Sequence, residues 1–308
     1  MTAQERIVRT GAASMTRPWL SILTPFHRHD PSPLLERLAQ MAGDEAEMVL
    51  LDDGSGSIDL VSTVVRAADR LPFPARLVVW EKNRGRAAAR NRLIAEARGV
   101  YVLFLDADMI PDAPDFLRRW LDLIDAEGPA AAFGGLSLKQ APRKRDTALH
   151  HFLFGRSDCR DAAARARDAA QFTAASNLLV RRDVLARTPF DSGFHGWGWE
   201  DVDWALRAAE IGPIRHIDNP ATHAGLDSAA TLLRKCREAG PNYERLLRKH
   251  PRARRFASYR AARALRALPG QKRLRPPLAA LARSAAPLPL RHAALKLYRT
   301  SIYAEHLP

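Results

Sequence analysis

Cysteine and long apolar runs are what this sequence has least of. Its two cysteines, Cys159 and Cys236, stand far apart without a Cys-x-x-Cys spacing, which argues against a disulfide framework or a structural zinc site. No stretch approaches the roughly 18 uncharged apolar residues of a membrane span, and residues 1–17 lack the apolar core of a secretory signal. We therefore expect a cytoplasmic protein that does not cross a membrane by itself.

Acidic residues are nearly missing from residues 229–308, which hold 19 Lys and Arg against 3 acids. The rest of the chain holds 29 basic and 31 acidic residues, so the net charge of +14 belongs to the tail. Arginines there alternate with apolar residues, which fits an anionic membrane surface; a solvated helical face or a subunit contact is the other interpretation. No RNA-binding motif is visible, so we expect no nucleic acid partner.

Short apolar runs alternate with helical patterns in the first half of the chain, the order typical of βαβ units. The predicted strands are Leu20–Thr24, Met48–Asp52, Arg76–Trp80, Tyr101–Leu105, Ala131–Leu138 and Asn177–Val180. The predicted helices are Pro33–Met41, a helix capped by Ser57 and ending at Arg70, Arg86–Arg98 closed by Gly99, Phe116–Asp125 and Asp201–Ile211. The polar stretch up to Ala170 shows no clear pattern. The fold class is therefore α/β, a Rossmann-like, mostly parallel sheet flanked by helices, with a basic helical C-terminal extension after His223.

Polar residues follow four of the predicted strands at the point where each strand ends. They are Thr24-Pro25, Asp52-Asp53, Asn83-Arg84-Gly85 and Asp106-Ala107-Asp108. Because the carboxyl ends of parallel strands share one edge of a sheet, where ligands bind, we expect the four motifs to converge. Two carboxylates at Asp106 and Asp108 can be aimed at one Mg²⁺ or Mn²⁺ ion and its phosphate ligands. Taken alone, each motif is also explained as an ordinary turn.

Four segments resemble the nucleotide-sugar glycosyltransferases of family two, which have the A-type glycosyltransferase fold. They occur in the family's order and at similar separations, and they read Leu20-Ser-Ile-Leu-Thr-Pro25, Val49-Leu-Leu-Asp-Asp-Gly-Ser55, Asn83-Arg-Gly-Arg-Ala-Ala-Ala-Arg-Asn91 and Phe104-Leu-Asp-Ala-Asp-Met-Ile-Pro111. The resemblance covers roughly residues 18–230. It implies transfer of a sugar from a nucleotide diphosphate, with UDP favoured, to a hydroxyl of a glycan or lipid-linked acceptor in cell-surface polysaccharide synthesis.

The resemblance also implies roles for individual residues of the donor site. Pro25 and Asp53 would flank the base and ribose, and Asn83 would belong to the donor-binding loop. Arg90 would lie near the nucleotide, and Asp106 would face the ribose. Without the resemblance, Arg90 is more simply a solvated residue on an Ala-rich helix.

A second segment, Gly196-Trp-Gly-Trp-Glu-Asp-Val-Asp203, resembles the Trp-Gly-Gly-Glu-Asp segment of galactosyl- and N-acetylgalactosaminyl-transferring relatives. In those relatives the aspartate after glutamate is the catalytic base, and that position here is Asp201. Trp197, Trp199 and Glu200 would line the acceptor and sugar pocket, where glycines admit a close approach and aromatic faces stack on sugars. The family often has Gly in place of Trp199, which predicts a narrower or differently shaped pocket. The alternative is an acidic first helical turn with both tryptophans packed in the core.

The metal site implied by the resemblance has two members. Asp108 would bind the ion, and His223 would occupy the place of a third metal-binding residue found in several relatives. Imidazole can complete a Mn²⁺ site begun by a carboxylate, and Mg²⁺ is the other candidate ion. A hydrogen-bonded structural histidine is the competing interpretation of His223. His195 is expected to shape the loop.

The predicted organisation is an N-terminal extension over 1–17, a nucleotide-sugar-binding half over 18–110, an acceptor-binding and catalytic half over 111–230 and a basic helical region over 231–308. We predict an inverting transfer in the cytoplasm, with the tail at the inner face of the cell membrane. One rival is a sugar-nucleotide nucleotidyltransferase, which usually has a glycine-rich phosphate loop where this chain reads Pro25-Phe-His-Arg-His-Asp-Pro31. The other is a non-catalytic basic protein that binds membranes or nucleic acid.

Overall fold

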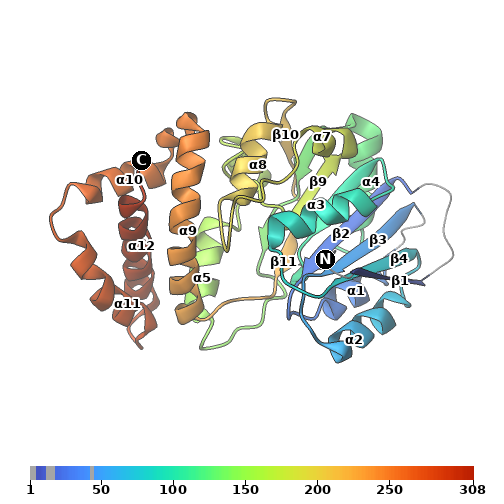
Figure 1. Ribbon diagram of the computed structural model, residues 1–308, viewed down its shortest axis with the longest axis horizontal. Coiled ribbons are helices and arrows are strands. Elements are labelled where there is room, and N and C mark those ends of the chain that lie inside the picture. The colour runs from blue at the N-terminus through green and yellow to red at the C-terminus, as the bar shows by residue number, and fades with distance from the viewer. Residues whose placement is uncertain (1–4, 12–17, 42–44) are drawn as a thin grey trace. The chain divides into compact units, whose positions relative to one another are not determined.

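The computed structural model describes residues 5–11, 18–41 and 45–308, and Figure 1 shows their helices and strands. They fall into two compact units. The first holds the described part of Met1–Ala141 with Asp158–Ser192 and Trp204–Gly225, and the second holds Pro142–Ser157, Gly193–Asp203 and Leu226–Pro308. Helix α8 (Glu200–Ala208) begins among residues of the second unit and ends among residues of the first.

The first unit contains an eight-stranded sheet made of described residues. Its strands lie in the order β1 (Glu5–Gly11), β4 (Pro74–Trp80), β3 (Ala46–Asp52), β2 (Leu20–Phe26), β5 (Tyr101–Leu105), β9 (Asn177–Arg181), β7 (Ala131–Phe133) and β10 (Ile214–His216). Strands β4, β3, β2 and β5 are parallel to one another, whereas β1 and β9 run antiparallel to their neighbours. Strands β3 and β5 are buried along their whole length, as parallel strands covered on both faces should be. The predicted fold class is confirmed.

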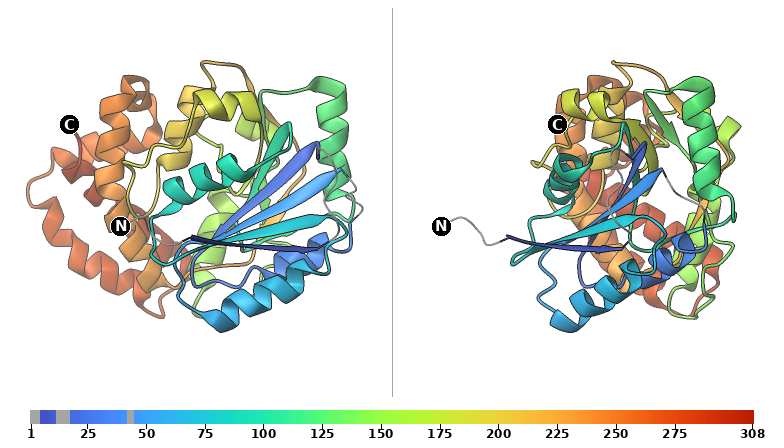
Figure 2. Two further views of the ribbon diagram at one scale, coloured as in Figure 1. Left: turned by 45° about the vertical axis from the view of Figure 1, so that its right-hand side comes forward. Right: turned by 90° about the vertical axis from the view of Figure 1, so that its right-hand side faces the viewer.

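Helices lie on both sides of the parallel strands. Helices α1 (Ser32–Leu38) and α2 (Ile58–Ala68) lie on one side, and α3 (Arg86–Glu96) lies on the other (Figures 1 and 2). The chain adds β3 and β4 on one side of β2 and then crosses back to form β5 on the other side of β2. Because such crossovers are right-handed, a connection that runs in the opposite direction places its helix, α3, on the opposite face of the sheet. Ser57 caps α2 as predicted, with its hydroxyl accepting a hydrogen bond from the Leu60 N–H at 3.1 Å. The unit also contains α4 (Phe116–Glu127), α6 (Ala162–Ala166) and α7 (Arg182–Arg187).

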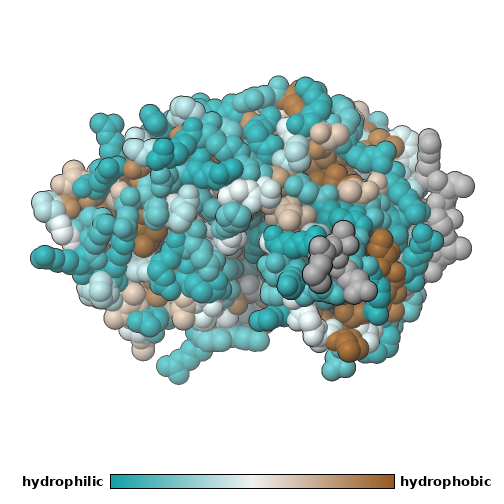
Figure 3. Space-filling model, in the orientation of Figure 1, coloured by the Kyte–Doolittle hydropathy of each residue, from teal (hydrophilic) through white to brown (hydrophobic). Residues whose placement is uncertain are grey.

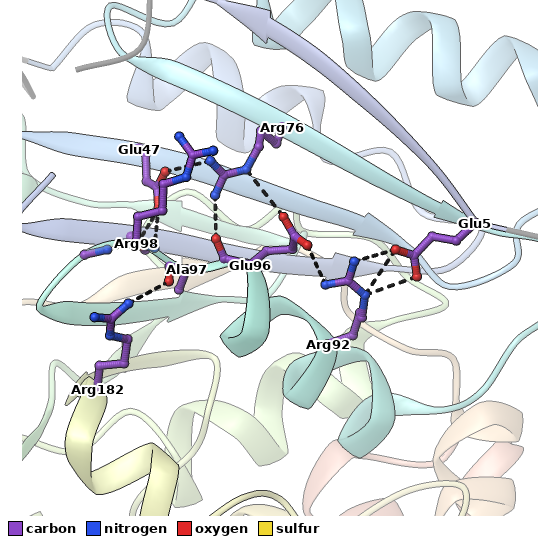
Figure 4. A network of polar contacts seen from close by, with 10 residues as sticks. Glu5, Glu47, Arg76, Arg92, Glu96, Ala97, Arg98 and Arg182 are labelled. Carbon is purple, nitrogen blue, oxygen red and sulfur yellow. Dashed lines mark hydrogen bonds and ion pairs between the residues drawn. The ribbon is translucent and has the colours of Figure 1, made fainter. Parts of the chain in front are cut away.

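Charged side chains near the amino ends of β3 and β4 pair with one another and with α3 (Figure 4). Glu47 lies 3.2 Å from the guanidinium of Arg76, which donates to the backbone carbonyl of Glu96 at 2.6 Å. The carboxylate of Glu96 pairs with Arg92 at 2.7 Å, and Arg92 also pairs with Glu5 of β1. The network therefore fastens both α3 and the N-terminal strand to the parallel strands.

A second sheet of described residues has three short strands, β6 (Met109–Pro111), β11 (Ala221–His223) and β8 (Leu136–Ser137). Strand β11 pairs antiparallel with β6 in a register that sets His223 opposite Met109. The Thr222 hydroxyl donates to Asp112 at 2.7 Å, which adds a side-chain bond between the two strands' ends. This small sheet brings the residues that follow β5 beside residues more than a hundred positions later in the chain.

The second unit is helical. Its helices are α5 (Ala148–Ser157), α9 (Ala229–Lys249), η1 (Pro251–Arg255), α10 (Ala257–Arg266), η2 (Gln271–Leu274), α11 (Arg275–Arg283) and α12 (Leu288–Glu305). Helix α12 packs against α5, α9, α10 and α11, so the predicted helical C-terminal region is confirmed. None of the helices formed by the described residues has both the length and the apolar composition that a membrane span requires. On the face drawn in Figure 3, hydrophilic side chains cover most of these helices, with apolar patches between them.

The single strand predicted at Ala131–Leu138 is wrong, because the structure divides it between two sheets. Strand β7 ends at Phe133, and β8 begins at Leu136 in the small sheet. The break falls at two glycines: a Cβ on Gly134 would lie 2.5 Å from the Asn177 amide, and Gly135 has φ +89°. Close packing and a left-handed backbone, rather than a strand, explain these glycines.

Three other elements differ from the prediction. Helix α3 ends at Glu96, and Gly99 lies beyond it, where a Cβ would come within 2.7 Å of the Ser21 backbone nitrogen. Part of the predicted N-terminal extension forms β1, which pairs with β4 at the sheet edge. The polar stretch without a clear pattern contains α5 and α6.

Candidate functional site

The strand order of the main sheet reverses between β2 and β5, whose carboxyl ends lie side by side. In open sheets of this kind, ligands bind in the crevice at such a reversal. The Thr24 hydroxyl donates to the backbone carbonyl of Leu105 at 2.7 Å and ties the two strand ends together. Pro25 and Asp106, the next residues along each strand, therefore belong to the same edge of the first unit.

The second and third polar motifs also meet in the first unit, around Asp53. The Asp53 carboxylate accepts hydrogen bonds from the backbone N–H groups of Arg84 at 2.6 Å and Gly85 at 3.0 Å, and the Asn83 side chain donates to the Asp53 carbonyl at 3.1 Å. Burial raises the pKa of Asp53 although these two N–H groups act to lower it. Gly54 is required at this junction, because a Cβ there would lie 2.3 Å from the Asn83 nitrogen. Asp53 thus fixes the loop between β4 and α3.

Asp106 pairs with the buried guanidinium of Arg90. The Arg90 Nη2 lies 3.2 Å from Asp106 Oδ1, and the Arg90 side chain is only 1% exposed. Burial alone would raise the pKa of Asp106, but the charges of Arg90, Arg86 and His223 and the Arg90 hydrogen bond hold it below its ordinary value. Arg90 is therefore not a solvated helix residue. Arg86, one turn earlier on α3, also lowers the pKa of Asp106, and it is not among the site residues predicted from the sequence.

Asp108 and His223 are brought together by the small sheet. The His223 Nε2 lies 3.4 Å from Asp108 Oδ2, and both side chains are partly exposed, at 19% and 24%. The backbone N–H of Ala224 donates to the Asp108 carbonyl at 2.9 Å and fixes the two segments side by side. Gly225 leaves room for the carboxylate, because a Cβ there would lie 2.1 Å from Asp108 Oδ2.

A divalent ion would find a carboxylate and an imidazole at this position. Both are suitable donors for Mn²⁺, and the carboxylate is also suitable for Mg²⁺. Within residues 5–11, 18–41 and 45–308, no three His, Cys, Asp or Glu side chains are grouped so that they could hold a metal ion by themselves. The donor set at Asp108 and His223 therefore fits a shared site, in which phosphate oxygens of a ligand and water would supply the other bonds.

The predicted catalytic segment lies in the second unit. Glu200 is buried, whereas Asp201 is half-buried in the first turn of α8. Trp199 has φ +74°, a left-handed backbone that is an outlier for a bulky residue and that glycine adopts readily. Glycine would adopt this conformation without strain, so the backbone at this position suits the Gly that the resemblance leads one to expect. The Trp199 ring packs against Tyr243, with ring centroids 4.8 Å apart, and Trp197 lies 5.7 Å from the Lys235 ammonium.

The sequence did not single out Asp203, which is fully buried on α8. Its carboxylate lies 2.9 Å from His250 Nε2 and 2.6 Å from Lys249 Nζ, both within the second unit. A buried carboxylate needs such partners, because an unpaired charge inside a protein is costly. The acidic run Glu200-Asp201-Val-Asp203 carries no local signal that its last member faces the interior.

Comparisons with curated proteins find relatives that build polysaccharides. The chain is 36% identical over 123 residues to the succinoglycan biosynthesis protein ExoU of Rhizobium meliloti (strain 1021), which covers 36% of this chain and 35% of that protein. It is 30% identical over 126 residues to a putative teichuronic acid biosynthesis glycosyltransferase, TuaG, of Bacillus subtilis (strain 168), covering 40% of this chain and 48% of that protein. The matches therefore span between about a third and a half of these relatives.

Solved structures share the fold across nearly the whole chain. A mannosyltransferase of Pyrobaculum calidifontis, in complex with GDP-Man and Mn²⁺, aligns with a TM-score of 0.60 at 19% identity, over 94% of this chain and 87% of that one. Residues 1–349 of S. aureus TarS, in complex with UDP, align with a TM-score of 0.54 at 16% identity, over 92% and 90% of the two chains. The fold is thus the A-type glycosyltransferase fold. The model of glycosyl transferase family 2 matches residues 21–188, more than half of the sequence, and the chain belongs to that family.

Proposed function

We propose that this protein transfers a sugar from a nucleotide diphosphate sugar, with UDP favoured, to a hydroxyl of a glycan or lipid-linked acceptor during cell-surface polysaccharide synthesis. The observation that carries the proposal is the gathering of Asp106, Asp108 and His223 beside the strand reversal of a family 2 fold. The biosynthetic relatives support the polysaccharide context. In this proposal, residues 18–110 bind the nucleotide sugar, and residues 111–230 supply the acceptor site and the base.

The donor site would use the residues at the strand ends. Pro25, Asp53 and the Asn83 loop would flank the base and ribose, and Arg90 would hold Asp106 ionised toward the ribose, since its guanidinium is fixed in the interior. Asp108 and His223 would bind Mn²⁺ or Mg²⁺. When bound, the ion would neutralise charge on the departing diphosphate. A structural neighbour that binds GDP-Man and Mn²⁺ supports this use of a divalent ion.

Asp201 would act as the general base of an inverting transfer. Its carboxylate takes the proton of the acceptor hydroxyl while that oxygen forms a bond to the anomeric carbon. The bond from the anomeric carbon to the diphosphate oxygen breaks, and its electron pair leaves with the nucleotide. Trp197, Trp199 and Glu200 would shape the pocket for the sugars. The base needs no covalent intermediate, because attack and departure occur on opposite faces of the sugar.

Asp201→Asn tests the base directly. We expect transfer to fall by roughly 10²- to 10⁴-fold, which is the typical contribution of a positioned base, while UDP affinity stays within about twofold. The assay is nucleotide release from a panel of UDP- and GDP-sugars with Mn²⁺, repeated with a chelator. Retained transfer in the variant removes Asp201 from the mechanism. Release of pyrophosphate instead of UDP or GDP would favour the rival nucleotidyltransferase.

We also propose that the second unit binds an anionic membrane surface at the inner face of the cell membrane, where a lipid-linked acceptor would be found. Its helices form an apolar pocket of about 280 Å³, lined by Leu265, Gln271, Leu274, Pro277, Leu278, Leu281, Leu297 and Ser301. Leu274 and Leu297 are 52% and 49% exposed, although leucine is usually buried. The strong positive charge of residues 229–308 complements an anionic bilayer.

Flotation of the full chain with phospholipid vesicles tests this surface. We expect binding to vesicles that contain phosphatidylglycerol and none to pure phosphatidylcholine. Leu274→Glu should lower the floating fraction several-fold, whereas Ile58→Glu, at an 84% exposed position on α2, should leave it unchanged. Equal flotation of both variants would contradict a role for the apolar pocket. Truncation is a poorer test, because α12 packs against α9 and its removal would disturb the whole unit.

A further inference from the structure

Helix α9 faces the Gly193–Asp203 segment with one side. The α9 residues that contact the segment recur every three or four positions, as the face of a helix requires. They are Lys235 with Trp197, Asn242 with His195 and Trp197, Tyr243 with Trp199, Arg245 and Lys249 with Phe194, and Lys249 with Asp203. Glu238 and Ala239 would be the nearest neighbours of a Cβ on Gly196 and on Gly198, and His250, just after the helix, also pairs with Asp203. All of these residues belong to the second unit.

The amide of Asn242 makes the polar contacts at the centre of this face. Its Nδ2 donates to the carbonyls of His195 at 2.8 Å and Trp197 at 3.3 Å, and its Oδ1 accepts from the His195 N–H at 3.3 Å. Asn242 is 4% exposed, so its amide needs partners within the protein, and the backbone of His195 and Trp197 supplies them. They bracket Gly196, whose φ is +70°. Only a side chain with both donors and an acceptor can satisfy the two carbonyls and the N–H together.

The aromatic rings next to Asn242 hold the strained end of the segment. The Trp199 ring lies 4.8 Å from Tyr243 and 5.7 Å from Tyr303 of α12, and the two tyrosine rings stack at 4.3 Å. A left-handed backbone at a bulky residue costs about 1–3 kcal/mol and persists only where its surroundings determine it. The Trp199 carbonyl accepts the Asp203 N–H at 2.9 Å in the first turn of α8. The backbone at Trp199 therefore sets the direction in which α8 starts and Asp201 points.

We propose that Asn242 is a positioning residue for the transfer, which acts by fixing the segment that carries Asp201. The inference rests on the proposed role of Asp201 as the base. Three hydrogen bonds between the Asn242 amide and the backbone of His195 and Trp197, together with the adjacent ring cluster, hold the segment in place. Losing the donors of Asn242 would free the glycines on either side of Trp197. A displacement of about 1 Å at a reacting group can cost a hundredfold in rate.

The test compares Asn242→Asp, which keeps the shape but removes both donors, with Asn242→Gln, which keeps donors and acceptor on a longer stem. We expect kcat to fall about 10- to 100-fold in Asn242→Asp and to recover partly in Asn242→Gln, with the Kd for UDP unchanged. Ser228→Ala is the matched control, because it removes the α9 N-cap bond to Thr231 without touching the segment. That variant should lose stability but keep kcat within about twofold.

A double variant separates this inference from the proposed function. If Asn242 acts through the base, Asn242→Asp should lower the residual rate of Asp201→Asn no further. If Asn242→Asp has the wild-type kcat while Asp201→Asn is inactive, the base role of Asp201 still holds but the positioning role of Asn242 is wrong. Equal losses of kcat in Asn242→Asp and Ser228→Ala would also overturn it, since both would then reflect stability. If Asp201→Asn keeps full transfer activity, Asp201 is not the base, and the positioning role proposed for Asn242 falls with it.

Discussion

The two ends of the parallel strands hold their charges in different ways. Near the amino ends, Glu47 is 3% exposed and contacts the Arg76 guanidinium, the Ser21 hydroxyl and the Arg98 N–H within 3.2 Å. At the carboxyl ends, Asp108 keeps a quarter of its side-chain surface exposed, and its contact with His223 is longer, at 3.4 Å. The first group holds helices and strands together, and the second has room to accept a ligand.

This difference teaches where a substitution should affect stability and where it should affect activity. Removing one partner of a buried pair leaves the other charge uncompensated in the interior. Removing a partly exposed carboxylate such as Asp108 leaves water to solvate its neighbour, so the fold loses little while a bound ion loses a ligand. Substitutions at the two ends should therefore have opposite profiles of stability and transfer.

Among the variants that compare the two strand ends, Asp108→Asn should have the largest effect, because it keeps the shape of the side chain and removes its charge. We expect metal-dependent transfer to fall roughly a hundredfold or more, because the ion loses its anionic ligand. The melting temperature should change by no more than about 2 °C. Nucleotide release over a Mn²⁺ titration measures the first quantity and calorimetry the second. Undiminished transfer at low Mn²⁺ would place the ion elsewhere.

Glu47→Gln should produce the opposite profile. Arg76 is 6% exposed, and a broken buried ion pair costs about 3–5 kcal/mol, so we expect the free energy of unfolding to fall by about 3 kcal/mol. Urea denaturation measures this loss. The kcat per folded molecule should stay within about twofold of the wild type. A large fall in kcat with normal stability would erase the contrast between the two strand ends.

His216 is a further test of the comparison, because it lies at the carboxyl end of β10 but is expected to contribute to stability rather than to transfer. Its Nδ1 accepts from Arg165 at 3.2 Å, and burial together with the Arg165 charge lowers its pKa to about 4. Unfolded His216 binds a proton near its ordinary pKa of about 6.5, so the stability it contributes is full above that pH and is lost as pH falls toward 4. Between pH 7 and pH 5 we expect a loss of about 2 kcal/mol, which His216→Gln should remove. Denaturation curves at both pH values check the slope, and identical slopes in both proteins would contradict the assignment.

Gly225→Ala should give the smallest of these effects. The added methyl would lie 2.1 Å from Asp108 Oδ2, so the carboxylate must shift. A shifted carboxylate should lower the affinity for the ion without abolishing its binding. We expect about a tenfold loss of transfer at limiting Mn²⁺, in line with the 10- to 100-fold cost of disturbing a ligand's surroundings. Excess Mn²⁺ should restore much of the rate. If the Mn²⁺ response matches the wild type, the Asp108 carboxylate has another position available.

The sequence predicted the parallel strands and their polar ends because each of these features is local. An apolar run such as Tyr101–Leu105 and the Asp-Ala-Asp that follows it lie next to each other in the chain, and parallel pairing then brings the four strand ends to one edge. The resemblance implied that His223 lies beside Asp108 but gave no physical reason for it. The structure supplies one, the pairing of β11 with β6.

The parts that could not be predicted depend on contacts between distant segments. Whether Asp201 or Asp203 faces the interior depends on Lys249 and His250, which lie more than forty residues away. The backbone of Trp199 is decided by rings from α9 and α12, and no local pattern marks a tryptophan in a conformation that suits glycine.

The N-terminal strand has a consequence for how the protein is handled. Strand β1 pairs along the whole of β4, and without it β4 would present a row of open N–H and C=O groups at the margin of the sheet. Such a margin invites strand pairing between molecules, and native proteins avoid it by covering or shortening their outer strands. At the other margin, β10 is only three residues long. Variants that carry a fusion tag or a short N-terminal deletion but keep Glu5–Gly11 should therefore stay monodisperse. Variants that lack this strand should aggregate.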